Sequence, residues 1–288
     1  MPRHVAICRF CLIAAVSGGL ITPAAAKSEE WHDAQGNTFR GEPAEVLGPL
    51  ALFRVSRTAG RMVPWHLLTP AECVRFYEAV RALPPRADDW AQAKGEVTQD
   101  LRGNVQRVQG DRLVPADLKG RPEPECYILL FASNGTSRSW EMMGDAGPYY
   151  GKLQQAYPGL TEALFFGLRH SRTEHANMAI SMRMSWLVAD LVEEEHMSTV
   201  ARLAPADFGM VIVNRDGVPL FSSGAENATA VKQTMEKLSG LLELLQPANP
   251  LTWNDRACYL RAIQPVVYAN GTSPPLLVGD PINAAALR

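Results

Sequence analysis

The sequence predicts an α+β protein of two modules, a small antiparallel β-barrel followed by an α/β domain with a mixed sheet. Three observations lead to this fold class. Short strand-like segments separated by turn residues come first, strand-like and helix-like segments alternate from residue 126 onward, and a hairpin followed by a long amphipathic segment closes that alternation. A length of 288 residues is also typical of about two domains.

The first 26 residues have the features of a cleaved secretory signal. Arg3 and Arg9 form a basic region, an apolar stretch runs from Phe10 to Ile21, and small residues precede Lys27. Serine and glycine interrupt the apolar stretch, which is shorter than the roughly 20 residues that a transmembrane helix needs. We therefore expect a secreted or periplasmic protein that begins at Lys27 and has no membrane span after cleavage.

The overall charge argues against nucleic acid as a partner. The formal net charge is -2 and the isoelectric point is near 6.3. Such a chain lacks the basic field that would hold a phosphate backbone.

The mature chain would keep three cysteines, Cys73, Cys126 and Cys258, at wide spacing. An odd number at this spacing is not the pattern of a disulfide framework. Isolated cysteines are usually small buried apolar groups, although an oxidising compartment leaves one bridge, of any pairing, open.

Residues 29–83 are predicted to form the small barrel and a helix. Apolar and polar residues alternate in Ala51–Ser56 and Arg61–Trp65, which a turn-like stretch separates. A helix is expected to follow, with Thr69 as N-cap and Pro70 at its first position.

This segment resembles the Sla homology domain one, an SH3-like barrel. The resemblance rests on the order of its residues: Trp31, Asp33, Gly36, Phe39, Glu45-Val46, a basic strand and MVPWHLLTPAE. In the actin-patch adaptor in which the domain was first described it binds short peptide motifs, whereas similar domains in secreted bacterial chains have no agreed ligand. The alternative is that the aromatic residues only fill the core of a small barrel.

Residues 84–100 combine paired prolines with mixed charge and indicate a linker that lies on the surface. A hairpin follows, with Val105 and Val108 before a turn at Gln109–Asp111. We expect this hairpin to extend one edge of the second module, which would span residues 101–246.

The second module is predicted to alternate strands and helices. Strands are expected at Cys126–Ala132, Leu160–Leu168, Trp186–Leu191, Gly209–Gly217 and Val218–Ser223. Helices are expected at Trp140–Tyr157, Thr173–Met184 and Ala228–Leu245, the first of them interrupted by Gly144, Gly147 and Pro148.

This order resembles the nucleoredoxin and tryparedoxin branch of thioredoxin-like proteins over about residues 125–246. The resemblance rests on YILLFAS, on Met182–Trp186 in place of a Met-Pro-Trp element, and on GMVIVNRDGVPLFSS at the last hairpin. It implies a mixed sheet and a pair of cysteines at a helix N-terminus. A Sla-type domain before such a module is an arrangement typical of secreted bacterial proteins.

The redox centre that the resemblance implies is missing. Counted from the strand, the two cysteine positions fall on Thr136 and Ser139; counted back from the proline in the helix, they fall on Trp140 and Met143. The position of the cis proline is occupied by Phe208. Because the chemistry needs a thiolate at the helix N-terminus, we expect no redox activity and no catalytic residue at this site.

No other catalytic or cofactor site is predicted. The hydroxyls near residue 136 lack a Gly-x-Ser-x-Gly elbow and a neighbouring base. The spacing of His170, His175 and His196 puts no pair on one helical face, and Glu193–Glu195 indicate a solvated acidic face. We therefore expect neither metal nor cofactor.

The expected function is non-catalytic binding of a protein or peptide. The candidate surface comprises Ser137, Arg138, Trp140, Trp186, Asp207 and Phe208. Two alternatives are open here: an accessible groove with aromatic anchors, or a vacated site filled by Trp140 and Phe208. The rival function is an enzyme related to thiol-disulfide oxidoreductases that uses a residual cysteine. The C-terminal extension, residues 247–288, is expected to pack on the second module.

Overall fold

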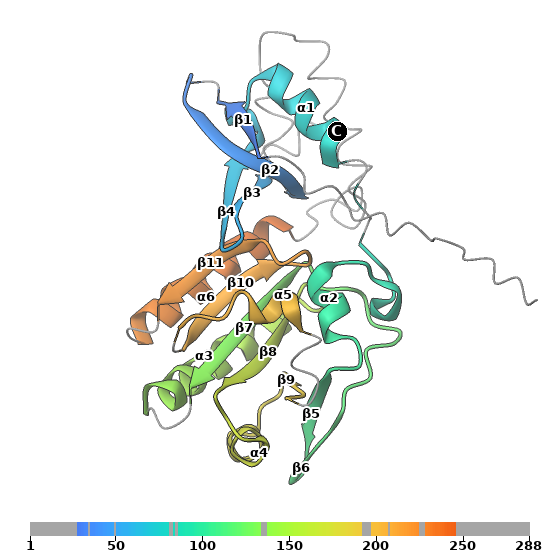
Figure 1. The fold of residues 1–288 in the computed structure, drawn as a ribbon, viewed down its shortest axis with the longest axis vertical. Helices are drawn as coiled ribbons and strands as arrows, with labels where there is room; N and C mark the ends of the chain where they lie inside the picture. Colours follow the sequence, from blue (N-terminus) through green and yellow to red (C-terminus); the bar gives the residue numbers. More distant parts are fainter. Residues whose placement is uncertain are drawn as a thin grey trace, which may run out of the picture.

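The computed structural model describes residues 28–33, 35–48, 50–80, 83, 86–133, 137–191, 197–206, 208–224 and 228–245 (Figure 1). The expected signal and C-terminal extension lie outside the described residues, as do Thr136, Asp207 and Cys258. In the part of the chain that is described, no helix combines the length and apolar character needed to cross a membrane.

The first module is an antiparallel sheet with one helix. Strands β1 (Glu29–His32), β2 (Thr38–Leu47), β3 (Leu50–Ser56) and β4 (Ala59–Pro64) pair in chain order, and a 3-10 helix η1 (Trp65–Leu67) leads into α1 (Pro70–Val80). A single bridge joins Asp33 to Leu68. The antiparallel sheet is as predicted, whereas its closure into an SH3-like barrel stays a prediction.

Aromatic side chains form the core of this module, between the sheet and α1. Trp31, Phe53, Trp65 and Phe76 have no exposed surface, and the rings of Phe53 and Phe76 lie 4.9 Å apart at 65°. The helix begins as predicted, because the backbone N–H of Glu72 donates to Thr69 Oγ1 at 3.3 Å.

Much of the expected linker is part of the second module instead. Residues 84–100 include a 3-10 helix η2 (Trp90–Gln92) and most of α2 (Glu96–Leu101). Trp90 and Val97 are buried in the same apolar cluster as Tyr127 of the central strand. Burial of these two large apolar side chains joins the segment to the second module, although its composition is that of a linker.

The second module contains a seven-stranded mixed sheet of order β11-β10-β7-β8-β9-β5-β6. Its strands are β5 (Val105–Gln109), β6 (Arg112–Pro115), β7 (Cys126–Ser133), β8 (Thr161–Leu168), β9 (Leu187–Ala189), β10 (Gly209–Asn214) and β11 (Pro219–Gly224). Strands β7, β8 and β9 run parallel, whereas β10 is antiparallel to both β7 and β11. The hairpin β5–β6 adds to one edge, as predicted.

Helices cover both faces of this sheet (Figure 1). They are α3 (Ser137–Ala156), α4 (Arg172–Ser181), α5 (Ser198–Ala201) and α6 (Ala228–Leu245). Alternate residues of β7 point to opposite faces: Ile128 and Leu130 join the core with α3 and α6, while Leu129 and Phe131 join the core with α2 and α5. The strand order and this layering give the predicted thioredoxin-like topology.

The small sheet packs on the second module. Leu47 and Leu52 are fully buried in the same apolar cluster as Ile212 of β10, while Phe53, which points the other way, faces α1. Gly60 makes the closest approach, since a Cβ atom there would collide with the carbonyl oxygen of Pro219. Each face of the small sheet therefore has a packing partner, although Val55 near the end of β3 is 44% exposed.

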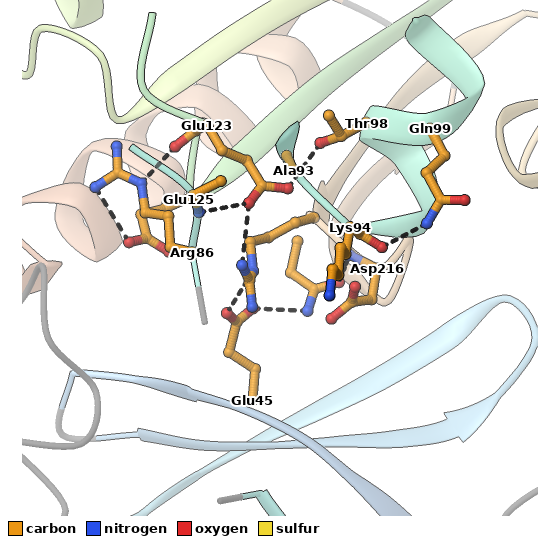
Figure 2. A network of polar contacts seen from close by, with 12 residues as sticks. Glu45, Arg86, Ala93, Lys94, Thr98, Gln99, Glu123, Glu125 and Asp216 are labelled. Carbon is orange, nitrogen blue, oxygen red and sulfur yellow. Dashed lines mark hydrogen bonds and ion pairs between the residues drawn. The ribbon is translucent and has the colours of Figure 1, made fainter. Parts of the chain in front are cut away.

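A buried polar network links the two modules (Figure 2). Arg215 donates through Nε to Glu45 Oε1 of β2 at 3.2 Å and through Nη1 to Glu123 Oε2 at 3.1 Å. Asn214 Nδ2 donates to Glu45 Oε2 at 2.7 Å, and Thr98 Oγ1 donates to Glu123 Oε1 at 2.8 Å. Since every partner is buried, the network fixes the orientation of the small sheet on the larger one.

Candidate functional site: a pocket at the carboxyl edge of the sheet

The ends of β7 and β8 place two helix N-termini at one edge of the sheet. Strand β7 ends at Ser133 shortly before α3, and β8 ends at Leu168 shortly before α4. Since β7 and β8 are parallel, both loops leave from the same edge. This carboxyl edge is where open α/β sheets usually bind ligands.

Ser139, one of the positions predicted to replace cysteine, has a structural role. Its side chain is fully buried, and Oγ accepts a hydrogen bond from the backbone N–H of Ser133 at 3.1 Å. The contact ties the first turn of α3 to the end of β7. A hydroxyl in this position supports the turn and supplies no thiolate.

The structure divides the predicted binding residues into two sets. Ser137 and Arg138 are exposed, and Trp140 is 45% exposed. Trp186 and Phe208 are 4% and 7% exposed and belong to the core. Phe208 therefore fills the space beside β10, whereas Trp140 does not act as a plug.

Trp186 does not edge a binding surface, contrary to expectation. Its ring packs edge-on against Tyr150 of α3, with the ring centroids 5.7 Å apart. Apolar contacts with the helix outweigh exposure at this position, because a large aromatic side chain gains most from burial.

An open pocket of about 340 Å³ lies beside Trp140. Its described lining combines polar and apolar side chains from four places in the chain: Ser133 of β7, Trp140 of α3, His170 before α4, and Glu174, Asn177, Met178 and Ser181 of α4. The size is typical of a site for a small molecule or one long side chain.

A capping box positions Glu174 at this pocket. The backbone N–H of Glu174 donates to Ser171 Oγ at 3.3 Å, and Glu174 Oε2 accepts from the backbone N–H of Ser171 at 2.8 Å. The carboxylate is thus held in the first turn of α4, where the helix dipole favours negative charge.

Two histidines meet at this pocket, one of which, His170, lines it, although their spacing does not place them on one helical face. The rings of His170 and His175 are 6.1 Å apart, because His170 precedes α4 and turns back toward it. His175 stacks on Phe165 at 4.5 Å and hydrogen-bonds the carbonyl oxygen of Ala189 through Nε2 at 2.9 Å. Gly167 permits this packing, since a Cβ atom there would collide with His175.

Both histidines favour the neutral form. Burial lowers the pKa of His175 from 6.5 to about 4, and the Ala189 carbonyl offsets part of this effect. Burial also lowers the pKa of His170, against smaller opposing effects of the Ser133 backbone and the Glu174 carboxylate. Among the described residues, no group of three histidine, cysteine or acidic side chains could hold a metal ion.

The two described cysteines lie away from this pocket and are buried as free thiols. Cys126 begins β7, at the opposite end from Ser133. Burial raises the pKa of Cys73 to about 12, helped by Glu72, and burial raises the pKa of Cys126 well above its ordinary value. Because the thiolate is the nucleophile, neither group is poised for thiol chemistry.

Sequence reasoning missed Glu174 and Asn177 as candidate binding residues and considered His170 only as a metal ligand. One local signal was present, because Ser171 and Glu174 have the spacing of a capping box. The proximity of α4 to Trp140 depends on the pairing of β7 with β8, which no local pattern contains.

No protein-family model matches the sequence, and no curated protein matches it either. Solved structures similar to this chain include tryparedoxin II from C. fasciculata, with 14% identity over 50% of this chain and 92% of that one, at a TM-score of 0.36. Thioredoxin from Wuchereria bancrofti has 15% identity over 49% and 96% of the two chains, at a TM-score of 0.36. A mutant of peroxiredoxin Q from Xanthomonas campestris has 10% identity over 54% and 99%, at a TM-score of 0.37.

Sequence identities this low bear on the fold alone. The fold of the second module is therefore assigned from its strand order. The core order β11-β10-β7-β8, with β10 antiparallel and the other three strands parallel to one another, is the thioredoxin-like arrangement. About half of this chain thus forms a thioredoxin-like domain.

Proposed function

We propose that this protein is a secreted or periplasmic, non-catalytic binding module that holds a segment of a protein or peptide at the carboxyl edge of its thioredoxin-like sheet. The observation that carries the proposal is Trp140, which is 45% exposed at the rim of an open pocket. Large aromatic side chains are usually buried, and exposed ones are typical anchors of binding surfaces.

The chemistry around the pocket supports binding rather than thiol-disulfide exchange. Ser139 occupies one predicted cysteine position and is engaged with the Ser133 backbone. Cys73 and Cys126 are buried with raised pKa values. The rival function, an oxidoreductase-related enzyme with a residual thiol, would have to use Cys258, which lies outside the described residues.

The small sheet offers less surface for a partner than the Sla-type resemblance implies. One face packs against α1 through aromatic residues, and the other packs on the second module through Leu47 and Leu52. Because the buried apolar side chains of both faces are engaged in these contacts, the pocket beside Trp140 is the better candidate for the binding surface.

A peptide array tests the proposal. The chain beginning at Lys27 is applied to an array of acetylated peptides of varied sequence. The Trp140→Ala variant and, as a control, the Val55→Ala variant are applied to identical arrays. Val55 is also an exposed large apolar residue, 44% exposed, but it lies on β3 of the other module. We expect some peptides to bind both the unaltered protein and the Val55→Ala variant and not to bind the Trp140→Ala variant. Identical binding by Trp140→Ala would reject the proposal.

Insulin reduction distinguishes the rival function. The unaltered protein should show no more activity than a variant in which Cys73, Cys126 and Cys258 are all serine, since no thiolate is presented at the helix N-terminus. Activity that depends on one cysteine would favour the enzyme and identify its nucleophile.

A further inference from the structure

The charges around the pocket do not select a charged ligand. Glu174 Oε2 already accepts hydrogen bonds from the backbone N–H of Ser171 at 2.8 Å and from its hydroxyl at 2.7 Å. Burial lowers the pKa of His170 and favours its neutral form. The segments that flank the pocket also carry three exposed arginines, Arg138, Arg169 and Arg172. Because the carboxylate is engaged and both signs of charge occur nearby, the pocket favours a neutral ligand group.

Two apolar side chains form part of the pocket wall. Trp140 is 45% exposed at the rim, and Met178 of α4 is 3% exposed and belongs to the core. Aromatic rings attract one another edge-on or offset-stacked, and a methionine sulfur makes favourable contacts with ring edges. The volume of about 340 Å³ has room for one large side chain. These wall groups suit an aromatic ring.

Asn177 and Ser181 form a row of neutral hydrogen-bonding groups along α4. They lie four residues apart and so share one helical face, with their Cβ atoms about 5–6 Å apart. Both line the pocket and are exposed, and within the described part of the chain neither side chain has a hydrogen-bond partner. Each can donate and accept. An extended peptide repeats its backbone groups on one side about every 6.6–6.8 Å, which is close to the spacing of this row.

We propose that the pocket binds one aromatic side chain of an extended peptide, packed against Trp140 and Met178, while Asn177 and Ser181 hold the peptide backbone on either side of it. This inference rests on the proposed function and specifies its ligand chemistry. The backbone contacts recognise any extended peptide, and the contacts with the ring select the residue between them.

Calorimetric titration of the chain beginning at Lys27 with matched peptides tests the inference. The probes are acetyl-Ala-Ala-Phe-Ala-Ala-amide and the same peptide with cyclohexylalanine, arginine or glutamate in place of phenylalanine. Cyclohexylalanine keeps the size and apolar character of phenylalanine and loses the aromatic ring. We expect it to bind about fivefold more weakly than phenylalanine, and both charged peptides to bind more weakly still.

One variant tests the backbone contact. Asn177→Ala should weaken the phenylalanine and cyclohexylalanine peptides equally, by about fivefold, because it removes a hydrogen bond that does not depend on the central side chain. Gln155→Ala removes another exposed amide, from α3 outside the described pocket lining, and should alter neither peptide. Circular dichroism checks that both variants keep their helices. Equal effects of Asn177→Ala and Gln155→Ala would overturn the inference.

A second pair of variants tests the ring contact. Met178→Leu keeps a similar apolar volume and removes the sulfur, so it should reduce the preference for phenylalanine over cyclohexylalanine at least about twofold. Met235→Leu makes the same change in α6, at a core position that is 2% exposed and outside the described lining, and should leave the preference unchanged. An unchanged preference in Met178→Leu would overturn the assignment of Met178 to the ring.

The outcomes separate this inference from the function beneath it. Array peptides that bind through Trp140 would leave the function standing, while equal binding of phenylalanine and cyclohexylalanine would overturn the inference. An arginine or glutamate peptide that binds as tightly as the phenylalanine peptide would overturn it as well. If no peptide binds in a way that depends on Trp140, both the inference and the proposed function fail.

Discussion

Arg215 of the second module lies 3.2 Å from Glu45 of the first, measured from Nε to Oε1, and neither side chain is more than 2% exposed. Glu45 lies on β2 and Arg215 directly follows β10, so the ion pair joins two sheets that are distant in sequence. The same guanidinium also pairs with Glu123 at 3.1 Å. This buried arginine therefore pairs with one acidic residue from each module.

Replacing this arginine should destabilise the whole protein. Arg215→Ala would leave Glu45 and Glu123 buried without their cation, and breaking a buried ion pair typically costs about 3–5 kcal/mol. Urea unfolding gives the free energy of unfolding. The control is Arg202→Ala, because Arg202 pairs with Glu96 at 2.8 Å with both side chains at least 34% exposed, and such a pair contributes less than about 1 kcal/mol. Equal small losses in both variants would contradict the role of the network.

The two tryptophans near α3 should respond differently to truncation. Trp140→Ala removes a half-exposed ring and should lower the free energy of unfolding by less than about 1 kcal/mol. Trp186→Ala empties a core site and should cost about 3–5 kcal/mol. Thermal and urea unfolding compare the variants. A large loss in Trp140→Ala would mean that its ring plugs the vacated redox position after all.

Stability should decrease as the pH falls because of His175. Its pKa is about 4 in the folded protein and near 6.5 when unfolded, so below pH 6.5 the unfolded chain binds the proton more readily. The contribution of neutral His175 to the free energy of unfolding is fully present above pH 6.5. It is lost progressively toward pH 4, by up to about 3 kcal/mol.

The variant His175→Gln isolates this effect. It removes the titrating ring while His170 and Asp190, the charged or titratable neighbours that act on it, stay in place. The difference in free energy of unfolding between the unaltered protein and the His175→Gln variant should change between pH 7 and pH 4. A constant difference across that range would exclude His175 as the source.

The described thiols should be unreactive while the protein is folded. In the chain that begins at Lys27 and carries Cys258→Ser, Cys73 and Cys126 are the remaining cysteines. Their burial and raised pKa values keep the thiolate fraction small, so Ellman's reagent should label neither thiol in buffer and both in denaturant. Rapid labelling of either thiol in the folded protein would reopen thiol chemistry at that residue.

Export should produce a chain that begins at or within a few residues of Lys27. The small residues that end at Ala26 favour cleavage there. Mass spectrometry of the exported protein measures the new N-terminus, and an intact Met1 would refute the expectation.

The sequence by itself determined most of the second module. Continuous apolar segments and a final amphipathic segment predicted β7, β8 and α6, and the cap at Thr69 predicted the start of α1. These features are local: a strand in a covered sheet is apolar throughout, and a cap is a hydrogen bond between near neighbours. The sequence likewise shows that no cysteine lies at the start of α3.

Local patterns failed where burial depends on distant partners. Residues 84–100 have the composition of a linker, yet Trp90 is buried beside Tyr127 of β7. Glu45 has the appearance of an ordinary strand residue, yet it is fully buried opposite Arg215. Composition cannot reveal a partner that lies elsewhere in the chain, whether Tyr127 for Trp90 or Arg215, 170 residues away, for Glu45.

Only the tertiary structure decided which of the predicted aromatic residues are accessible and where the pocket opens. Trp140, Trp186 and Phe208 are alike in sequence terms, but packing buries the last two and leaves the first at the rim. The parallel pairing of β7 with β8 brings the start of α4, and with it Glu174, to the same edge of the sheet as Trp140. Accessibility is a property of contacts between elements, so it is fixed only when the strands have paired and the helices have packed.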